Sequence, residues 1–229
     1  MYKLLVFLTF FFLSPESDHD HISVRMNKRV NQDGVTSTIN AQIYYSDEGN
    51  MVTKYSSPKE FLVFNNNKGE VTMYDAAENT VLQSINFTFS TENSNFFYFL
   101  NNEKKDMGLE KMGFLLKNSD MENDVLVSIW RAPMEMSKHF SNVKLVQRTD
   151  VPIYMDYSDA KGKVIKKIYF SDYQKIAGKD FPASVTEINY LKKDSIVAKT
   201  VFSDFQENTS TGYELFNFEI PKNAKLIKK

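Results

Sequence analysis

Hydrophobic and polar residues alternate along most of the chain. Residues 22–30 place apolar side chains on one face and polar side chains on the other, and residues 85–89 repeat this pattern. A period of two predicts β-strands that are buried on one face. The pair Asp33-Gly34 and the segment 65–69 are turn signals between such strands. Because these connections are too short for helical crossovers, we expect the strands to pair in an antiparallel meander.

The alternation is interrupted once, between residues 91 and 113. Apolar residues recur there at intervals of three and four, which predicts one or two short helices rather than a strand. Thr91 or Ser94 is placed to cap the first helix, because Ser and Thr side chains accept hydrogen bonds from the free amides of a first turn. The sequence therefore predicts a short aromatic helical insert between two sets of strands.

A second series of alternating segments runs from residue 143 to residue 205. Pro58 lies between two apolar segments of the first series and predicts a bend there, because proline cannot donate a ladder hydrogen bond. The whole pattern predicts about eleven strands, and neither a solenoid repeat nor a Gly/Ser-rich linker divides it. We expect one domain of the α+β class, built on a mainly antiparallel, strongly curved sheet.

The N-terminal residues follow a different pattern. Lys3 precedes an uncharged apolar run over residues 4–13, and a small polar region follows it. This order predicts a secretory signal peptide over residues 1–17 and a mature domain over residues 18–229. The run of ten residues is short for a membrane-spanning helix, which needs about 20. A buried N-terminal strand or helix is the alternative.

Composition narrows the class of protein further. The chain has no cysteine, which excludes disulfides, thiolate catalysis and the lipidated cysteine of a bacterial lipoprotein. Its 28 basic and 29 acidic residues create no bulk field that would favour nucleic acid or an anionic membrane. The 19 Phe, 12 Tyr and 10 Met suit a large apolar interior or an adaptable binding surface. We expect an exported, unanchored and monomeric protein of the periplasm.

No pattern along the chain indicates catalysis. Asp18, His19, Asp20 and His21 can bind metals, but they lie near a chain end, so we expect them to be exposed to solvent rather than to form a metal site. His139 stands alone, and pairs of carboxylates fall in predicted turns, where Asp favours turn geometry. The G-x-S-x-G, G-x-G-x-x-G and P-loop motifs are absent. The sequence predicts a protein that is not an enzyme, with no catalytic residue, metal ligand or cofactor.

Two segments resemble the LolA family of periplasmic lipoprotein carriers. In residues 55–75, a strand, a proline turn, a strand, a glycine turn and a strand that ends in Tyr-Asp follow one another, and the matching positions are Tyr55, Pro58, Leu62, Val63, Gly69, Tyr74 and Asp75. In residues 216–227, the matching positions are Phe216, Phe218 and Pro221. The resemblance extends over residues 22–229.

The resemblance implies an incomplete β-barrel, with short helices over its open mouth and an apolar cavity for lipoprotein acyl chains. The implied lid residues are Phe96, Phe97, Leu100, Met107 and Met112, and the residues that face them are Met73, Phe87, Phe89 and Trp130. Ordinary core packing is the alternative for each. The implied partners are lipoprotein acyl chains or another lipid, with membrane-associated donor and acceptor proteins and no nucleic acid. Relatives of this fold also act as protein-interaction or envelope-sensing modules, which is the alternative function.

Overall fold

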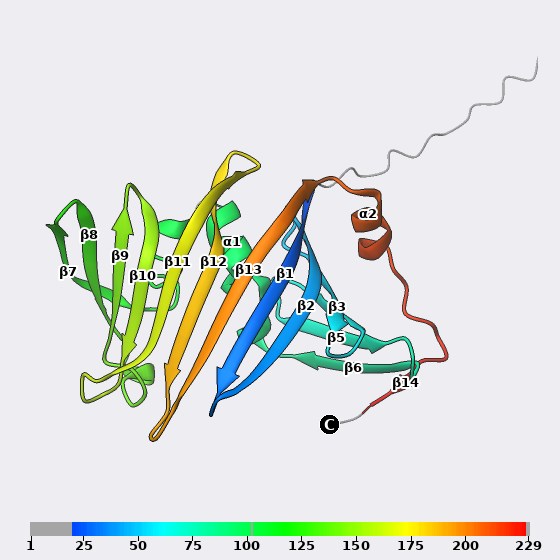
Figure 1. Cartoon of the computed structure of the whole chain (residues 1–229), viewed down its shortest axis with the longest axis horizontal. Helices are drawn as coiled ribbons and strands as arrows, with labels where there is room; N and C mark the ends of the chain where they lie inside the picture. Colours follow the sequence, from blue (N-terminus) through cyan, green and yellow to red (C-terminus); the bar gives the residue numbers. More distant parts are fainter. Residues whose placement is uncertain (1–19, 102, 228–229) are drawn as a thin grey trace, which may run out of the picture.

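The computed structural model describes residues 20–101 and 103–227, and the predicted signal peptide lies outside them. The described chain forms one 14-stranded sheet with a few short helices (Figure 1). The strands are β1 His21–Gln32, β2 Val35–Ser46, β3 Met51–Ser57, β4 Phe61–Asn65, β5 Glu70–Asp75, β6 Thr80–Ile85, β7 Leu115–Glu122, β8 Val125–Arg131, β9 Asn142–Arg148, β10 Val151–Ser158, β11 Val164–Ile176, β12 Lys179–Tyr190, β13 Ser195–Glu207 and β14 Lys225–Leu226.

The helices are short. They are α1 Asn95–Leu100 and α2 Ser210–Phe216, with 3-10 turns η1 Phe87–Phe89, η2 Thr91–Asn93, η3 Glu103–Lys105 and η4 Met134–Met136. No helix among residues 20–101 and 103–227 is long and apolar enough to cross a membrane.

The order of the strands shows how the chain builds the sheet. From β1, strands β2 to β6 are added one after another towards one edge, where β14 pairs in parallel with β6. The chain then crosses to the opposite edge, begins again at β7 and returns strand by strand until β13 pairs with β1 in antiparallel orientation. Figure 1 shows β7 and β14 at opposite ends of the sheet, which is therefore open. The predicted open and mainly antiparallel sheet is confirmed.

The predicted number of about eleven strands is wrong, because the sheet has 14. Strand β14 has only two residues, which are too few to show an alternating pattern. The alternation over residues 85–89 is also not a strand, since β6 ends at Ile85 and a 3-10 turn follows. Asn86 caps this turn by accepting the N–H of Thr88 at 2.9 Å. A local side-chain hydrogen bond thus competes with the ladder that the alternation of apolar residues predicts.

The turns follow the sequence signals closely. Asp33 and Gly34 adopt φ angles of 51° and 75°, which are both positive, as a two-residue hairpin with the twist of its strands requires. Strand β3 ends at Ser57 and β4 begins at Phe61, so the predicted bend at Pro58 is confirmed.

Residues 86–114 cross the sheet from one edge region to the other, because they join β6 to β7. The first predicted helix of this insert is confirmed as α1, whereas residues 107–112 form turns, and Ser94 caps α1 by accepting the N–H of Phe97 at 3.2 Å. Figure 1 shows α1 behind the central strands of the sheet. The ring centroid of Phe96 lies 5.2 Å from that of Phe181 on β12. The sheet face that packs against α1 is called the inner face below.

The main hydrophobic core lies between α1 and the inner face. Phe99 on α1 and Phe181 on β12 are both fully buried, with ring centroids 5.8 Å apart. Tyr45 on β2 and Phe202 on β13 contact Phe96 in the same cluster. The aromatic residues of the insert therefore attach it to strands from both halves of the chain.

The C-terminal segment covers the outer face of the first strands. Phe64 and Tyr74 alternate with the inner-facing residues of β4 and β5, so they point outwards. The ring of Phe218 stacks on Phe64 at 5.9 Å and lies 5.8 Å from that of Tyr74. Beyond it, β14 covers the edge of β6, which leaves β7 as the uncovered edge of the described sheet.

Candidate functional site

A cavity of about 1250 Å³ lies between the insert and strands β10, β11 and β12. The sheet contributes its floor, and residues of the insert contribute its roof. The floor residues are Met155, Tyr157, Lys166, Ile168, Phe170, Val185 and Glu187. The roof residues include Phe87, Phe97, Tyr98, Met107, Gly108 and Met112, and Met136 of η4 also borders the cavity.

Strand register brings the floor residues together. Met155 pairs with Ile168 across β10 and β11, and Phe170 pairs with Val185 across β11 and β12. Directly paired residues project from the same face of a sheet. Three consecutive strands therefore present one continuous, largely apolar floor on the inner face.

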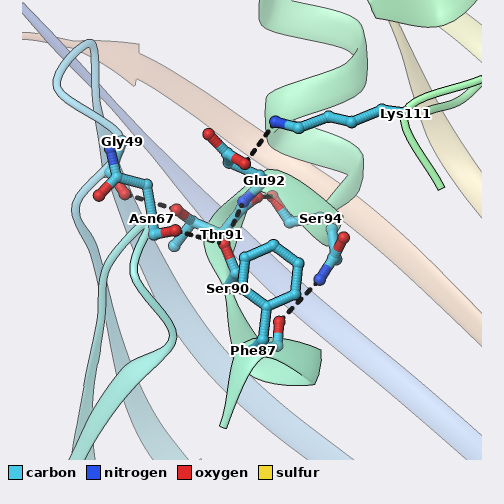
Figure 2. Close-up of polar contacts among 9 residues, drawn as sticks. Gly49, Asn67, Phe87, Ser90, Thr91, Glu92, Ser94 and Lys111 are labelled. Atoms are coloured by element: carbon cyan, nitrogen blue, oxygen red, sulfur yellow. Dashed lines mark hydrogen bonds and ion pairs between the residues drawn. The ribbon is translucent and has the colours of Figure 1, made fainter. Parts of the chain in front are cut away.

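Hydrogen bonds fix the start of the roof to two turns of the sheet (Figure 2). The buried Thr91 donates from Oγ1 to the carbonyl of Gly49 at 2.6 Å, and Ser90 donates from Oγ to the carbonyl of Asn67 at 2.8 Å. Glu92 forms an ion pair with Lys111 at 2.5 Å, which joins the two ends of the insert. These contacts define where the roof begins relative to the sheet.

The other end of the roof wraps around Tyr98. Gly108 adopts a φ of 74°, and a β-carbon there would lie 2.7 Å from Cε1 of Tyr98, so only glycine fits without a shift of the ring. Lys104 of η3 donates to Asp180 of β12 at 2.9 Å, and Lys175 contacts the other oxygen of the same carboxylate at 2.7 Å. The insert is thus tied to the sheet beyond α1 as well.

The cavity also contains a small number of polar groups. Burial, with a contribution from Asp106 and then Glu92, raises the pKa of Tyr98 to about 12. Burial also raises the pKa of Tyr157 to about 12. Both phenols therefore remain neutral at physiological pH.

A charged group lies on the floor beside these phenols. Glu187 lies 2.8 Å from Nζ of Lys166 and 4.0 Å from Nζ of Lys28. An apolar floor with a few polar groups at defined positions is typical of small-molecule sites.

The structure divides the predicted site residues into three groups. Phe87, Phe97, Met107 and Met112 line the cavity. Phe96, Leu100 and Trp130 belong to the core or pack against it, and Phe96 and Trp130 are only 4% and 9% exposed. Met73 is partly exposed on β5 and Phe89 is exposed in η1, and neither belongs to the cavity lining or to the core cluster.

The floor residues Met155, Ile168, Phe170 and Val185 were not predicted. Their alternation along the strands was visible in the sequence, but it does not show which face of a strand turns towards the insert. The pairing of three strands that are distant in sequence from the insert decides this.

The expectation of an exposed His21 is wrong. Its side chain is 2% exposed and packs edge-on against Tyr213 of α2, with ring centroids 4.6 Å apart. Asp18 and His19 lie outside the described residues. Among residues 20–101 and 103–227, no group of three or more His, Cys, Asp or Glu side chains is placed to hold a metal ion.

Comparison with known proteins identifies the architecture. No family model matches the chain, and no curated protein matches it. A DUF1329 family protein from Desulfovibrio piger aligns with a TM-score of 0.57 at 15% identity, over 85% of this chain and 88% of that one. A LolA superfamily protein from Nitrosomonas europaea aligns with a TM-score of 0.55 at 12% identity, over 82% and 86%. The chain has a LolA-like fold.

A third solved structure agrees with this assignment. It is an outer membrane lipoprotein-sorting protein domain from Vibrio parahaemolyticus, with a TM-score of 0.56 and 17% identity over 85% of this chain and 88% of that one. At these identities the likeness concerns the fold alone. Within the LolA-like fold of this chain, the insert forms the cover and strands β10 to β12 form the floor of the cavity.

Proposed function

We propose that this protein binds the acyl chains of lipoproteins, or a similar amphiphile, in the cavity beneath the insert and carries them through the periplasm towards the outer membrane. The observation that supports this most is the cavity of about 1250 Å³ with its floor of Met155, Ile168, Phe170 and Val185. Pockets that bury a drug-sized ligand measure roughly 300–1,000 Å³. The space therefore suits a bulky ligand such as one or more acyl chains.

The energetics favour a hydrocarbon ligand. Each CH₂ group that leaves water contributes about 0.8 kcal/mol, so a partly enclosed chain is already held out of water. Met107, Met112, Met136 and Met155 line the cavity from several elements. Methionine side chains adapt to irregular shapes, which suits the variable chains of natural lipids. Glu187 and Lys166 offer a polar end for the rest of the amphiphile.

The proposed function also includes export of the protein and its membrane-associated partners. Residues 1–17 act as a cleaved signal peptide, and residues 18–229 act as one lipid-binding domain. Membrane-associated proteins supply the ligand and accept it. The protein acts by binding and release and catalyses no reaction.

The proposal is tested by filling the cavity. Ile168→Trp places a larger side chain on the floor, and we expect at least tenfold weaker binding of a long-chain fluorescent fatty acid, since each lost CH₂ contact costs about 0.8 kcal/mol. Val201→Trp is the matched control. Val201 is 39% exposed and alternates with the inner-facing Phe202 on β13, so it faces outwards.

Both variants should unfold within about 1 kcal/mol of the wild type, because Ile168 is only partly buried and borders the cavity, and Val201 is exposed. Mass spectrometry of lipids that co-purify with the wild-type protein identifies the natural ligand. Failure of the wild type to bind fatty acid or lipoprotein would contradict the proposal and favour a protein-interaction module.

A further inference from the structure

The segment 85–89, named the apolar tip, exposes three large hydrophobic side chains beside the cavity. The exposed fractions are 79% for Ile85, 64% for Phe87 and 55% for Phe89. Phe87 also lines the cavity, so the tip lies at its border. Single exposed hydrophobic residues are common, but three within five residues form a patch that needs a partner. We propose that the apolar tip inserts into the surface of a lipid bilayer and brings the cavity to the membrane.

Three backbone N–H groups of the apolar tip are hydrogen-bonded within the protein. The N–H of Asn86 donates to the carbonyl of Gly69 at 2.8 Å, and the N–H of Phe89 donates to the carbonyl of Asn86 at 2.9 Å. The N–H of Thr88 donates to Oδ1 of Asn86 at 2.9 Å. A segment that enters hydrocarbon must have its polar backbone groups bonded within the protein, and these three donors meet that condition.

The carbonyl groups of Phe87 and Phe89 are also bonded within the protein. The carbonyl of Phe87 accepts the N–H of Ser90 at 3.0 Å and Nδ2 of Asn93 at 2.9 Å, and Figure 2 shows the second of these bonds. The carbonyl of Phe89 accepts from Nδ2 of Asn65 at 3.3 Å. The side chains are therefore free to insert while the backbone stays bonded to the protein.

Charge and backbone bonding favour a bilayer over a protein partner. Residues 84–91 contain no charged side chain, so the segment itself carries no charge into lipid. A partner that adds a strand to a sheet needs free backbone groups, and the N–H groups of Asn86, Thr88 and Phe89 are already bonded within the protein. A lipid surface needs only the three apolar side chains.

A second segment shows the same arrangement. In η4, Met134 is 86% exposed, whereas Met136 lines the cavity. Two segments that are distant in sequence thus combine an exposed apolar residue with a neighbour on the cavity wall. This recurrence supports a role of exposed apolar groups in transfer between cavity and membrane, and in this respect the inference rests on the proposed function.

The test uses a fluorescent label at the tip. Because the full chain has no cysteine, Thr88→Cys provides a single site for an environment-sensitive nitrobenzoxadiazole label. With vesicles of phosphatidylethanolamine and phosphatidylglycerol, we expect a blue shift and a rise in emission. The response should persist in high salt, which screens charge attraction but not apolar insertion. A label at Asn123→Cys, in the exposed β7–β8 turn, should show no response.

Loss of the apolar side chains should abolish the response. Adding Ile85→Ser and Phe89→Ser to the labelled chain should weaken vesicle binding at least tenfold, since each change removes a large apolar side chain from the lipid contact. The control adds Val35→Ser and Met121→Ser, which are 72% and 69% exposed on β2 and β7 and should leave binding unchanged. All variants carry the same apolar run at residues 4–13, so a difference in vesicle binding between them comes from the substituted residues.

The design separates this inference from the proposed function. Ile85 and Phe89 do not belong to the cavity lining, so their replacement should leave binding of a fluorescent fatty acid within about twofold. No label response in the wild-type background, or an equal response after the Ile85 and Phe89 changes, would overturn membrane insertion even if fatty acid still binds. Loss of fatty-acid binding by Ile168→Trp would remain evidence for the cavity alone.

Discussion

A β-carbon on Gly212 would lie 2.0 Å from Nε2 of His21. The same nitrogen accepts the N–H of Thr209 at 3.0 Å, so α2 begins with its backbone bonded to the start of β1. Phe216 contacts the imidazole from the other end of the helix at 5.7 Å between ring centroids. Strand β1 and helix α2 are almost 190 residues apart in the chain, and this contact joins them directly.

We predict that Gly212→Ala destabilises the protein by about 1–3 kcal/mol, because the new methyl group must displace the imidazole or the helix. The sign of the change in the free energy of unfolding is informative. At an open helix position, alanine is more stable than glycine by roughly 0.5–1 kcal/mol. Equilibrium denaturation measures the free energy of unfolding. Thr211→Ala, exposed in the same helix, is the control and should stay within about 0.5 kcal/mol of the wild type. Stabilisation by Gly212→Ala would show that the imidazole has room to move.

A second prediction concerns the attachment of the insert. Thr91 is 1% exposed, and its Oγ1 donates to the carbonyl of Gly49 at 2.6 Å (Figure 2). Thr91→Val keeps the shape but removes this donor, so we expect a loss of about 1–3 kcal/mol in the free energy of unfolding. Thr88→Val, the same change at an exposed position, should be neutral within about 0.5 kcal/mol. Equal effects of the two changes would exclude a structural role of the Thr91 hydroxyl.

A third prediction concerns acid stability. Hydrogen bonds from Lys175 and Lys104 lower the pKa of Asp180 below its usual value. A carboxylate with a lowered pKa in the folded state adds stability that is present above its unfolded pKa of about 3.9 and is lost as the pH falls through the folded pKa. Denaturation measured between pH 5 and pH 2 should therefore show that the contribution of Asp180 to the free energy of unfolding disappears. This contribution is no more than about 1 kcal/mol, because the side chain is partly exposed.

Two variants isolate the contribution of Asp180. Asp180→Asn should remove this part of the acid dependence, because the amide does not titrate in that range. Lys104→Ala should reduce it and should also loosen the insert, since Lys104 joins η3 to β12. An acid dependence of Asp180→Asn identical to that of the wild type would show that other carboxylates account for the effect.

Sequence patterns predicted the features that depend on neighbouring residues. The hairpin at Asp33-Gly34, the bend at Pro58 and the cap at Ser94 are all local, and each is confirmed. Features that depend on distant strands were not predictable in the same way. His21 lies near the N-terminus, but the helix that buries it, α2, lies near the C-terminus. The number of strands was also wrong, in part because pairing with β6 makes a strand of the two residues of β14, which are too few to show a period.

The adjacent residues Phe96 and Phe97 show the same limit within the candidate site. Both were predicted to form the lid, because apolar spacing marks a helix and its apolar side but not which neighbour contacts the sheet. In the structure, Phe96 is 4% exposed and packs among the core aromatics, whereas Phe97 is partly buried and lines the cavity. The rotation of α1 against the inner face decides the difference.

This difference leads to the last prediction, which compares one substitution at two adjacent positions. Phe96→Ala should cost about 3–5 kcal/mol, as expected for removal of a packed core aromatic side chain. Phe97→Ala should cost less than about 2 kcal/mol, because part of its ring faces the cavity and not packed atoms. The substitution is to alanine because an aspartate at position 97 would introduce a new ion pair. Nζ of Lys111 lies 5.6 Å from the centroid of the Phe97 ring and would pair with the new carboxylate.

Ligand binding should follow the opposite order when both variants are measured under conditions in which they are folded. Phe97→Ala removes part of the roof, so the affinity for a fluorescent fatty acid should fall by about tenfold, which corresponds to roughly 1.4 kcal/mol of lost contact. Phe96→Ala should retain affinity within about threefold once the folded fraction is taken into account, because its ring contacts Phe181 and Phe202 and not the cavity. Thermal unfolding and fluorescence titration of the same samples give both quantities. If the two variants lost stability and affinity in the same proportion, Phe97 would be part of the core like Phe96, and the ligand would have to contact the protein elsewhere.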